Sequence, residues 1–407
     1  MKKSWNPAAW KTIMRTKKMR TGGAAVMALT HKFLVPDYYP EFRCKGGECR
    51  CTCCNGWGIS VSQQEYFRLL GMDCPPELRR RLDCAFHAPE DPSPERYRLL
   101  TPRWDGDCPL RAQDGLCALQ CACGEEALPA VCRYYPRGVH IEFAYECSCT
   151  NSCEKVLEML FDREEPLTVV TRELSFAFDP PKGRALRKPR GYYNAIRKMC
   201  ADILHNRKIP VRDRIWLVRD ALLEIEPMLE GGQGDMLGTL TRHSLCAEPA
   251  QLPQGDAAAA LECVRALCDI LAETSTSLGQ YSEQASLALQ DGAALVQAQT
   301  HFASLFPHWQ RDFENMLLNH LFYECFPFSD AQENLRDEGL ALCATYALVR
   351  YLTVGCMAGR EERSVYVDAA AAAFRLIEHS KFDHNAAVIL RGMGCDGEET
   401  LGGLLRL

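Results

Sequence analysis

The sequence predicts a mainly α protein in which an irregular cysteine-rich module precedes an all-α helical domain. Fifteen of the 23 cysteines lie between Cys44 and Cys153, a stretch interrupted by many glycines and prolines. From Tyr192 onward the apolar residues instead recur with the period of an α-helix. A chain of 407 residues can bury more than one hydrophobic core, so separate units are expected.

Residues 1–32 are predicted to form a basic, disordered leader. They are rich in lysine and arginine, and no acidic residue precedes Asp37. The apolar stretch 22–29 contains two glycines and continues into His31 and Lys32 without a small-residue cleavage site, which disfavours a signal peptide. No apolar run approaches the roughly 18 residues that cross a bilayer, so no membrane segment is expected.

Residues 33–165 are predicted to form the cysteine-rich module, whose glycines and prolines favour loops and short helices. One helix is expected from Ser62 to Leu70, because Ser62 and Glu65 have the spacing of a capping box. Residues 166–190 are interpreted as a linker with a solvated basic end. Within this linker, the segments 167–171 and 174–178 are predicted to be short strands, arranged as a hairpin.

Residues 191–407 are predicted to form the helical domain. After Pro210, apolar residues recur on one helix face from Ile215 to Leu229, with charged residues opposite. Similar patterns occupy roughly residues 192–206, 257–278, 285–305, 313–326, 334–357, 364–379 and 384–393. No repeat of fixed period is evident, which favours a helical bundle over a solenoid.

The cysteines indicate metal binding more strongly than disulfides. Without export the thiols stay reduced, and an odd total of 23 cannot pair off completely. The formal net charge of −6 argues against nucleic-acid binding, whose footprint would be basic. The cysteines outside the rich region are interpreted as small buried hydrophobic residues: Cys200, Cys246, Cys263, Cys268, Cys325, Cys343, Cys356 and Cys395.

The densest thiol cluster places Cys44, Cys49, Cys53 and Cys54 within eleven residues. Thiolates are the ligands of iron–sulfur clusters and of structural zinc. The spacing matches neither a zinc ribbon nor a ferredoxin, and the C-x3-C-x2-C signature of radical adenosylmethionine enzymes fails because position 56 is glycine. The spacing therefore predicts a metal without identifying it.

Several motifs in this order resemble the flagellin lysine-N-methylase family, and the cysteine module also resembles zinc- or iron-chelating cysteine-cluster proteins. The resemblance is carried by Cys44, Cys49-x3-Cys53-Cys54-x2-Trp57, Gly106-Asp-Cys108-Pro-Leu110, Gly115-Leu-Cys117, Cys132-Arg-Tyr-Tyr-Pro-Arg137 and Ser152-Cys153. It implies a bacterial cytoplasmic enzyme that transfers a methyl group from S-adenosylmethionine to lysine ε-amines of flagellin. It also implies an iron–sulfur cluster, expected as [4Fe–4S], with zinc as the alternative metal.

Carried over by position, the resemblance implies eight metal-ligand cysteines: Cys44, Cys49, Cys53, Cys54, Cys108, Cys117, Cys132 and Cys153. One cluster takes four thiolates, which leaves four for a second metal, disulfides or packing. The sequence carries further cysteines that are extra to this pattern: Cys51, Cys121, Cys123, Cys147 and Cys149.

The catalytic residues are not evident from the sequence, and only weak candidates can be named. Tyr135 and His320 are candidates for the reaction itself, against the simpler interpretations of packing and hydrogen bonding. Arg133 and Arg137 are candidates for binding the cofactor, against structural salt bridges. No Rossmann-type glycine motif is present, so the sequence does not locate the adenosylmethionine site. Two other functions remain open: a non-catalytic iron- or zinc-binding and delivery protein, and a redox protein.

Overall fold

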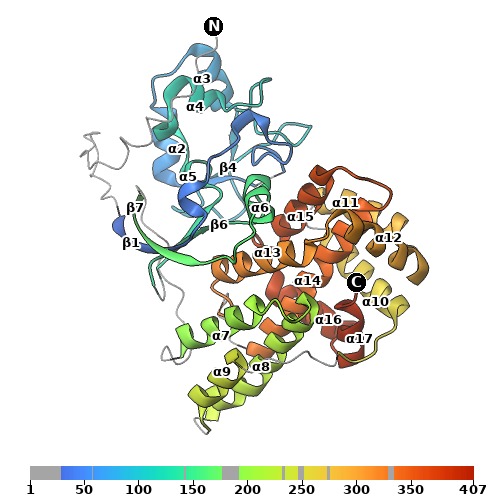
Figure 1. The fold of residues 1–407 in the computed structure, drawn as a ribbon. Helices are drawn as coiled ribbons and strands as arrows, with labels where there is room; N and C mark the ends of the chain where they lie inside the picture. Colours follow the sequence, from blue (N-terminus) through green and yellow to red (C-terminus); the bar gives the residue numbers. More distant parts are fainter. Residues whose placement is uncertain are drawn as a thin grey trace.

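The computed structural model describes residues 29–56, 58–141, 144–176, 192–231, 234–245, 252–272, 276–328 and 334–407. It is mainly helical, with a small sheet-containing N-terminal region, so the predicted fold class is confirmed. Figure 1 shows the cysteine-rich region at the top and the helical domain below it.

A four-stranded sheet links the two regions. Its order is β5 (Arg137–His140), β6 (Glu146–Cys149), β1 (Leu29–Pro36) and β7 (Val169–Phe176). The expected hairpin within the linker is wrong, because residues 169–176 form one continuous strand that pairs antiparallel with β1. Residues 29–32, expected in the leader, also belong to β1, while residues 1–28 and most of the linker, 177–190, lie outside the described residues.

The segment between the first cysteines and β5 folds around its own small sheet. Strands β2 (Ser60–Val61), β4 (Arg98–Leu100) and β3 (Phe86–His87) pair in that order. Around them lie α2 (Gln63–Leu70), α3 (Pro76–Asp83), α4 (Ala118–Cys123) and α5 (Ala130–Tyr134). The capping box of α2 is confirmed, since the Glu65 amide donates to Ser62 Oγ at 3.3 Å and the Ser62 amide donates to Glu65 Oε2 at 2.9 Å.

The helical domain begins at Tyr193 and contains α7 to α17. Their bounds are α7 Tyr193–His205, α8 Val211–Gly231, α9 Met236–Leu245, α10 Ala257–Ala272, α11 Thr276–Ala288, α12 Gly292–Leu305, α13 Trp309–Tyr323, α14 Leu335–Met357, α15 Arg363–Ile377, α16 Phe382–Gly392 and α17 Glu398–Leu404. The helix predicted over 285–305 is two helices, because Asp291 caps a new one by accepting from the Ala294 amide at 2.8 Å.

Helix α14 is the central element of this domain and packs against α8, α11, α15 and α16. It corrects the expectation that no segment is long and apolar enough to cross a membrane, since its 23 residues meet both criteria. The most apolar 18-residue window is, however, wholly buried inside the protein. A helix surrounded by other helices is apolar on all sides, so its composition is explained by its place in the core.

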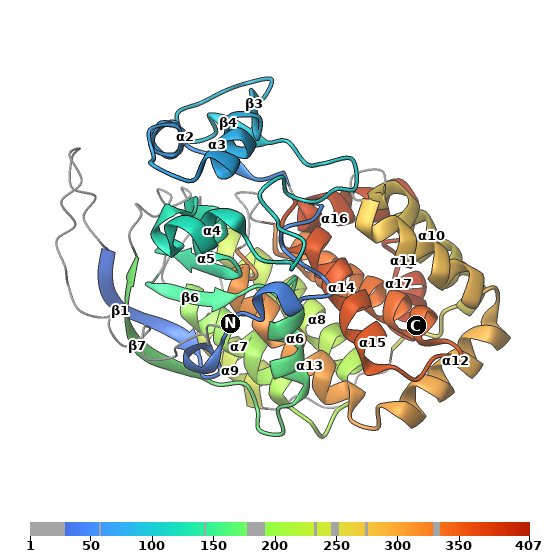
Figure 2. The same ribbon diagram turned by 90° about the horizontal axis from the view of Figure 1, so that it is seen from above.

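Two hydrophobic cores divide the described residues. The large core joins the helices of the helical domain to the four-stranded sheet and to α6 (Glu154–Phe161). The small core lies within residues 69–128, among α2, α3, α4 and β4. In Figures 1 and 2, α6 lies against α13, whereas α2 and α3 stand away from the helical domain. The cysteine-rich stretch therefore contributes to both cores.

Candidate metal centre

The electrostatic neighbours of the eight cysteines predicted as ligands divide them into two groups of four, which are linked through Cys53 and Cys54. The first group, which we name the junction set, consists of Cys44, Cys49, Cys53 and Cys153. Burial, then the negative charges of Cys44, Glu154 and Cys153, raises the pKa of Cys49 to about 12. Burial also raises the pKa of Cys153 to about 11, with Cys44 as a charged neighbour. Cys44 is thus a charged neighbour of both Cys49 and Cys153, which disfavours ionisation of these thiols in the absence of a metal.

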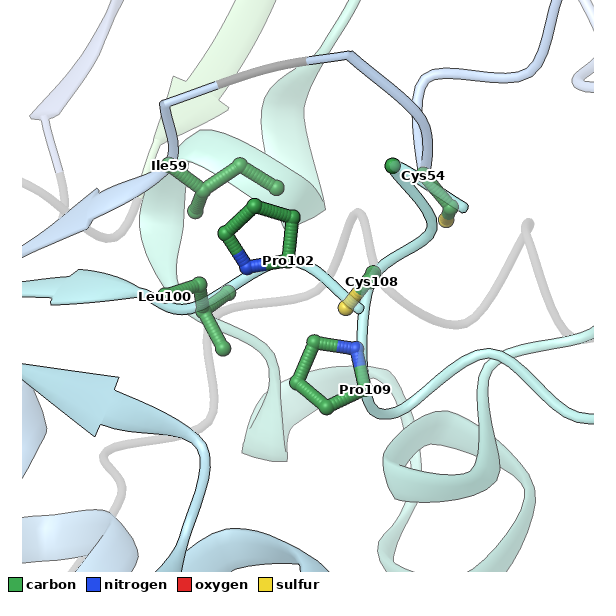
Figure 3. Close-up of a pocket in the computed structure, with 7 residues that line it drawn as sticks. Cys54, Ile59, Leu100, Pro102, Cys108 and Pro109 are labelled. Carbon is green, nitrogen blue, oxygen red and sulfur yellow. The ribbon is translucent and has the colours of Figure 1, made fainter. Parts of the chain in front are cut away.

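The second group, the module set, consists of Cys54, Cys108, Cys117 and Cys132. Burial raises the pKa of Cys132, and the charges of Cys108, Cys117 and Cys54 raise it further. Cys54 and Cys108 also line one small pocket together with Ile59, Leu100, Pro102, Gly106 and Pro109, as Figure 3 shows. Cys108, Cys117 and Cys132 thus pack against the small core, and Cys54 lines the pocket beside it.

Backbone amides are directed at several of these sulfurs. Cys108, Cys117 and Cys153 each accept hydrogen bonds from amides two and three residues further along, and these bonds lower their pKa values against the larger effect of burial. The Gly46 amide donates to Cys44 Sγ at 3.4 Å. Amide donors stabilise the thiolate, which is the form that binds a metal. Members of both sets therefore have the surroundings expected of metal ligands.

The two sets meet at the neighbouring residues Cys53 and Cys54. A hydrogen bond from Cys53 lowers the pKa of Cys54, and a further bond to Thr52 and the charge of Arg111 act in the same direction. The pKa of Cys53 is raised correspondingly, first by that bond and then by burial. A thiolate at position 54 is therefore favoured even without a metal.

Two glycines allow the loops that carry the sets to touch. A Cβ at Gly47 would lie 2.5 Å from the Asp114 carbonyl oxygen, and a Cβ at Gly115 would lie 2.8 Å from the Gly47 carbonyl oxygen. Gly115 also has φ +80°, a conformation that side chains disfavour. The Cys44–Cys49 loop consequently lies directly against the turn that leads to Cys117.

Ion pairs and hydrogen bonds hold the loop of residues 44–54 against helices α6 and α15. Lys45 Nζ pairs with Glu154 at 2.5 Å and with Glu158 at 2.9 Å, both on α6. On α15, Arg375 Nη2 donates to the carbonyl oxygens of Cys51 and Thr52 at 2.7 and 3.0 Å. The loop is thus held from two helices, and its backbone carbonyls are satisfied by a guanidinium.

Cys51, one of the extra cysteines, belongs to neither set. Its sulfur lies within 4.8 Å of carboxylate oxygens of Glu154 and Asp368, a grouping that resembles a metal site. Arg50 already pairs with Asp368 at 3.0 Å, and Lys45 pairs with Glu154. The protein's own cations therefore neutralise these carboxylates, and the group is better described as an ion-pair network.

The remaining cysteines have structural surroundings. Cys147 and Cys149 are fully buried in β6, and Cys147 donates to Tyr39 OH at 3.3 Å. Six of the eight later cysteines are buried as expected; Cys395 is half-buried, and Cys246 lies outside the described residues. Within the described ranges no two cysteines form a disulfide.

A buried polar network adjoins the junction set. Tyr135 OH lies 3.0 Å from Ser152 Oγ, which lies 2.9 Å from His379 Nε2. Thr150 Oγ1 donates to the Glu378 carboxylate and lies 2.9 Å from Ser152 Oγ. Tyr135 is the member of the network next to the junction set, because it interacts electrostatically with Cys153 and Cys53.

Glu378 is the centre of this network. Its carboxylate accepts from the Asn151 amide at 2.7 Å and lies 3.0 Å from His320 Nδ1. Asn319 extends the network by donating to Asn151 Oδ1 at 2.8 Å. Glu378 itself is 6% exposed, so its charge is compensated mainly by these donors.

The structure thus connects Tyr135 and His320, the two weak catalytic candidates, through residues that sequence reasoning missed. These are Thr150, Asn151, Ser152, Glu378 and His379. The polar run from Thr150 to Ser152 directly before Cys153 was the available signal, since three polar residues there interrupt an otherwise buried segment.

Histidine 379 lies at the outer edge of the network. Part of the residue is exposed to solvent, whereas Nε2 on the inner edge of the ring lies 2.9 Å from Ser152 Oγ. Desolvation on this inner side, partly offset by the charge of Glu378, lowers the pKa of His379 to about 4. The ring is therefore neutral at physiological pH, with the Tyr135 and Tyr323 rings at centroid distances of 6.3 and 6.5 Å.

The two arginines named as cofactor candidates lie in different surroundings. Arg133 Nε donates to the Glu125 carbonyl at 3.2 Å within the small module. The Arg137 guanidinium lies over the rings of Tyr39 and Phe42, 5.8 and 5.1 Å from their centroids. Both have protein partners, and a role in cofactor binding stays a prediction.

Fold and site together define a helical protein that holds a cysteine cluster against a buried polar network. Thiolates with amide donors are ligand types of zinc and of iron–sulfur clusters, so both metal classes stay predictions for these cysteines. Comparison with known proteins finds a partial likeness. Residues 197–394 match the FliB lysine N-methylase C-terminal domain, so this part of the chain is similar to that family.

Curated proteins are similar to this chain over a short segment. Lysine-N-methylases of Salmonella typhimurium and Salmonella choleraesuis are 28% identical over 105 residues, which is 26% of this chain and 26% of theirs. The flagellar biosynthetic protein FliU of Salmonella muenchen is 27% identical over 105 residues, which is 62% of its length. The match thus spans about a quarter of the lysine-N-methylases. No solved structure matches this chain.

Proposed function

We propose that the protein is a lysine N-methyltransferase that transfers the methyl group of S-adenosylmethionine to lysine ε-amines of flagellin. The observation that carries this proposal is the match of residues 197–394 to the FliB lysine N-methylase C-terminal domain. The matched segment contributes His320, Glu378 and His379, which form the polar network beside the thiols. The name of the FliU relative, a flagellar biosynthetic protein, supports flagellin as the substrate.

The network suits a reaction between two cationic partners. The amine must lose its proton before it attacks the methyl carbon, and the bond from that carbon to the sulfonium sulfur then breaks with its electron pair left on sulfur. A site for these partners should present negative and aromatic groups and no unpaired cation. Glu378 supplies the negative charge, and Tyr135 and Tyr323 supply the rings, while His379 stays neutral.

Each residue of the network has a separate part in this scheme. His379, exposed at the edge, accepts a hydrogen bond from the incoming amine and orients it. Ser152 and Tyr135 position the ring of His379 through the hydroxyl contacts at 2.9 and 3.0 Å. Holding the reacting groups in line at near-attack distance supplies much of the rate enhancement in transfers of this kind.

The thiols hold the metal of the proposed enzyme, and we place that metal as an iron–sulfur cluster, with zinc as the alternative. When bound, such a group supplies an electrophilic centre next to the polar network. The reduced thiols that it needs are those of the bacterial cytoplasm, where we place the protein.

The decisive experiment is a methyl-transfer assay on anaerobically purified protein. Flagellin and S-adenosylmethionine carrying a labelled methyl group are incubated with the wild type, and the label is mapped by peptide mass spectrometry. We expect the label on lysine side chains of flagellin. A metal-loaded protein that transfers no label to flagellin would contradict the proposal and favour a non-catalytic metal-binding and delivery protein.

A further inference from the structure

We propose that Trp104 is a docking anchor that holds the flagellin chain beside the buried polar network. Trp104 is 97% exposed, whereas the other exposed large apolar side chains among the described residues are 37% to 78% exposed. Tryptophan is enriched among the residues that carry the binding energy of protein interfaces. The identity of the partner rests on the proposed function, whereas the exposure of the indole and its support do not.

The turn below the indole is held by hydrogen bonds and ion pairs. Residues 103–106 form a β-turn, closed by the Gly106 amide, which donates to the Arg103 carbonyl oxygen at 2.9 Å. The Arg103 guanidinium pairs with Asp107 at 2.8 Å and with Asp105 at 3.3 Å. Gly106 has φ +81°, a conformation that side chains disfavour. The indole is therefore presented to solvent from a well-supported backbone.

Asp107 joins this turn to the rest of the module. Its carboxylate pairs with Arg111 at 2.9 Å and accepts from Asn55 Nδ2 at 2.7 Å. Asn55 Nδ2 also donates to the Asp105 carbonyl oxygen at 3.2 Å. A single exposed apolar residue is common on protein surfaces, so exposure alone would not distinguish this indole. Support of this kind does, because a contact group that is ordered before binding spares the partner the free energy of ordering it.

The turn lies close to the outer edge of the polar network. Asn55 and Asp107 form an isolated β-bridge, which places the turn against the loop of residues 51–56. From α15, Arg375 Nη1 donates to the Asn55 carbonyl oxygen at 3.4 Å. Arg375 is four residues before His379, the residue that receives the amine in the proposed function. Two contacts therefore connect the turn of Trp104 to the helix end that carries His379.

The occupant of this surface is a segment of flagellin next to the lysine that reacts. A lysine side chain that reaches His379 brings its neighbouring residues onto the surface beside it. The carboxylates and guanidinium groups of the turn pair with one another, so the turn offers an apolar contact and little net charge. The matching group on flagellin is therefore an apolar side chain close to the target lysine, which packs on the face of the indole.

Binding of flagellin to a Trp104 variant tests the anchor without any chemistry. Anaerobically purified wild type and Trp104→Ala are passed over immobilised flagellin without S-adenosylmethionine, and the dissociation constants are compared. We expect Trp104→Ala to bind roughly tenfold more weakly or worse, with the metal content and circular dichroism of the wild type. Because the indole is almost wholly exposed, its removal leaves no cavity in the fold. Equal affinities overturn the proposal, and so does a wild type that does not bind flagellin.

Val296→Ala is the matched control. Val296 is also an exposed apolar residue, but it lies on α12 of the helical domain, and the variant should bind flagellin with the wild-type affinity. A loss of affinity in Val296→Ala as large as that in Trp104→Ala would show that the effect is not specific to the turn, and would overturn the assignment.

Steady-state methyl transfer separates docking from catalysis. With S-adenosylmethionine saturating, the KM of Trp104→Ala for flagellin should rise roughly tenfold while kcat changes by less than about twofold. A fall in kcat at unchanged KM would overturn the docking role. The two proposals can fail separately. A wild type that binds flagellin through Trp104 but transfers no methyl group refutes the proposed function alone, whereas methyl transfer by the wild type with unchanged affinity of Trp104→Ala refutes only the anchor.

Discussion

Asp312, in the first turn of α13, provides a quantitative test of the described packing. The residue is 6% exposed, and its Oδ1 is buried without a hydrogen-bond partner. Burial raises the pKa of Asp312 to about 7, although the charges of Arg311 and Arg363 act in the opposite direction. The carboxyl group of an unfolded chain titrates near pH 4, so the folded protein retains a proton that the unfolded chain has lost.

The sign of the pH dependence follows from this difference. Between about pH 4 and pH 7 the folded state binds more protons than the unfolded state, so stability falls as the pH rises through this interval. Above about pH 7 the penalty is fully present. A shift of about three pKa units corresponds to at most about 4 kcal/mol, and structural relaxation around the ionised carboxylate reduces this value.

The substitution Asp312→Asn removes the titrating group and retains the shape. Near pH 5 the variant should be more stable by at most about 1.5 kcal/mol, because only about one of the three pKa units separating the folded and unfolded carboxyl has been crossed. At pH 8 the variant should be more stable by about 2–4 kcal/mol, a difference of several degrees in melting temperature for a domain of this size. Thermal unfolding followed by circular dichroism at both pH values is the assay. A difference that does not change with pH would refute the reasoning.

Three further variants test the candidate site. Gly47→Ala should lower the metal content, because its Cβ would lie 2.5 Å from a facing carbonyl, whereas Gly58→Ala, with open space around it, should retain the wild-type metal content. Arg375→Ala removes the donors to the carbonyl oxygens of Cys51 and Thr52 and should speed metal loss to a chelator several-fold. An unchanged rate would show that these hydrogen bonds do not hold the cysteine loop in place. Glu378→Gln should reduce methyl transfer at least tenfold at unchanged metal content, measured in the flagellin assay, and equal activity would remove Glu378 from the scheme.

Features set by neighbouring residues could be predicted from the sequence. Helix α2 begins at its capping box because Ser62 and Glu65 satisfy each other's amides within one turn. The helical domain could be predicted for the same reason, since apolar residues that recur with the helical period of 3.6 residues can be seen in the sequence. The boundary within 285–305 was missed because Asp291 caps a new helix between two similar apolar patterns.

Features that depend on distant partners could not be predicted. Strand β7 is continuous because β1, more than a hundred residues earlier, pairs with it over eight positions, which a local reading as a hairpin cannot reveal. Glu378 reaches Thr150 and Asn151 across more than two hundred residues. Polar networks of this kind are built by tertiary packing, and no local spacing records them.

The grouping of the cysteines shows this limit most clearly. The junction set takes its members from both ends of the cysteine-rich stretch, Cys44 and Cys153, while the module set comes from between them. The adjacent Cys53 and Cys54 belong to different sets, so proximity in sequence would have assigned them to the same one. Their Cα atoms are only about 3.8 Å apart, as in any trans peptide. A displacement of one residue must therefore move the other, so Cys54→Ser should also change the rate at which an alkylating reagent modifies Cys53. An unchanged rate at Cys53 would show that the shared peptide does not couple the two thiols.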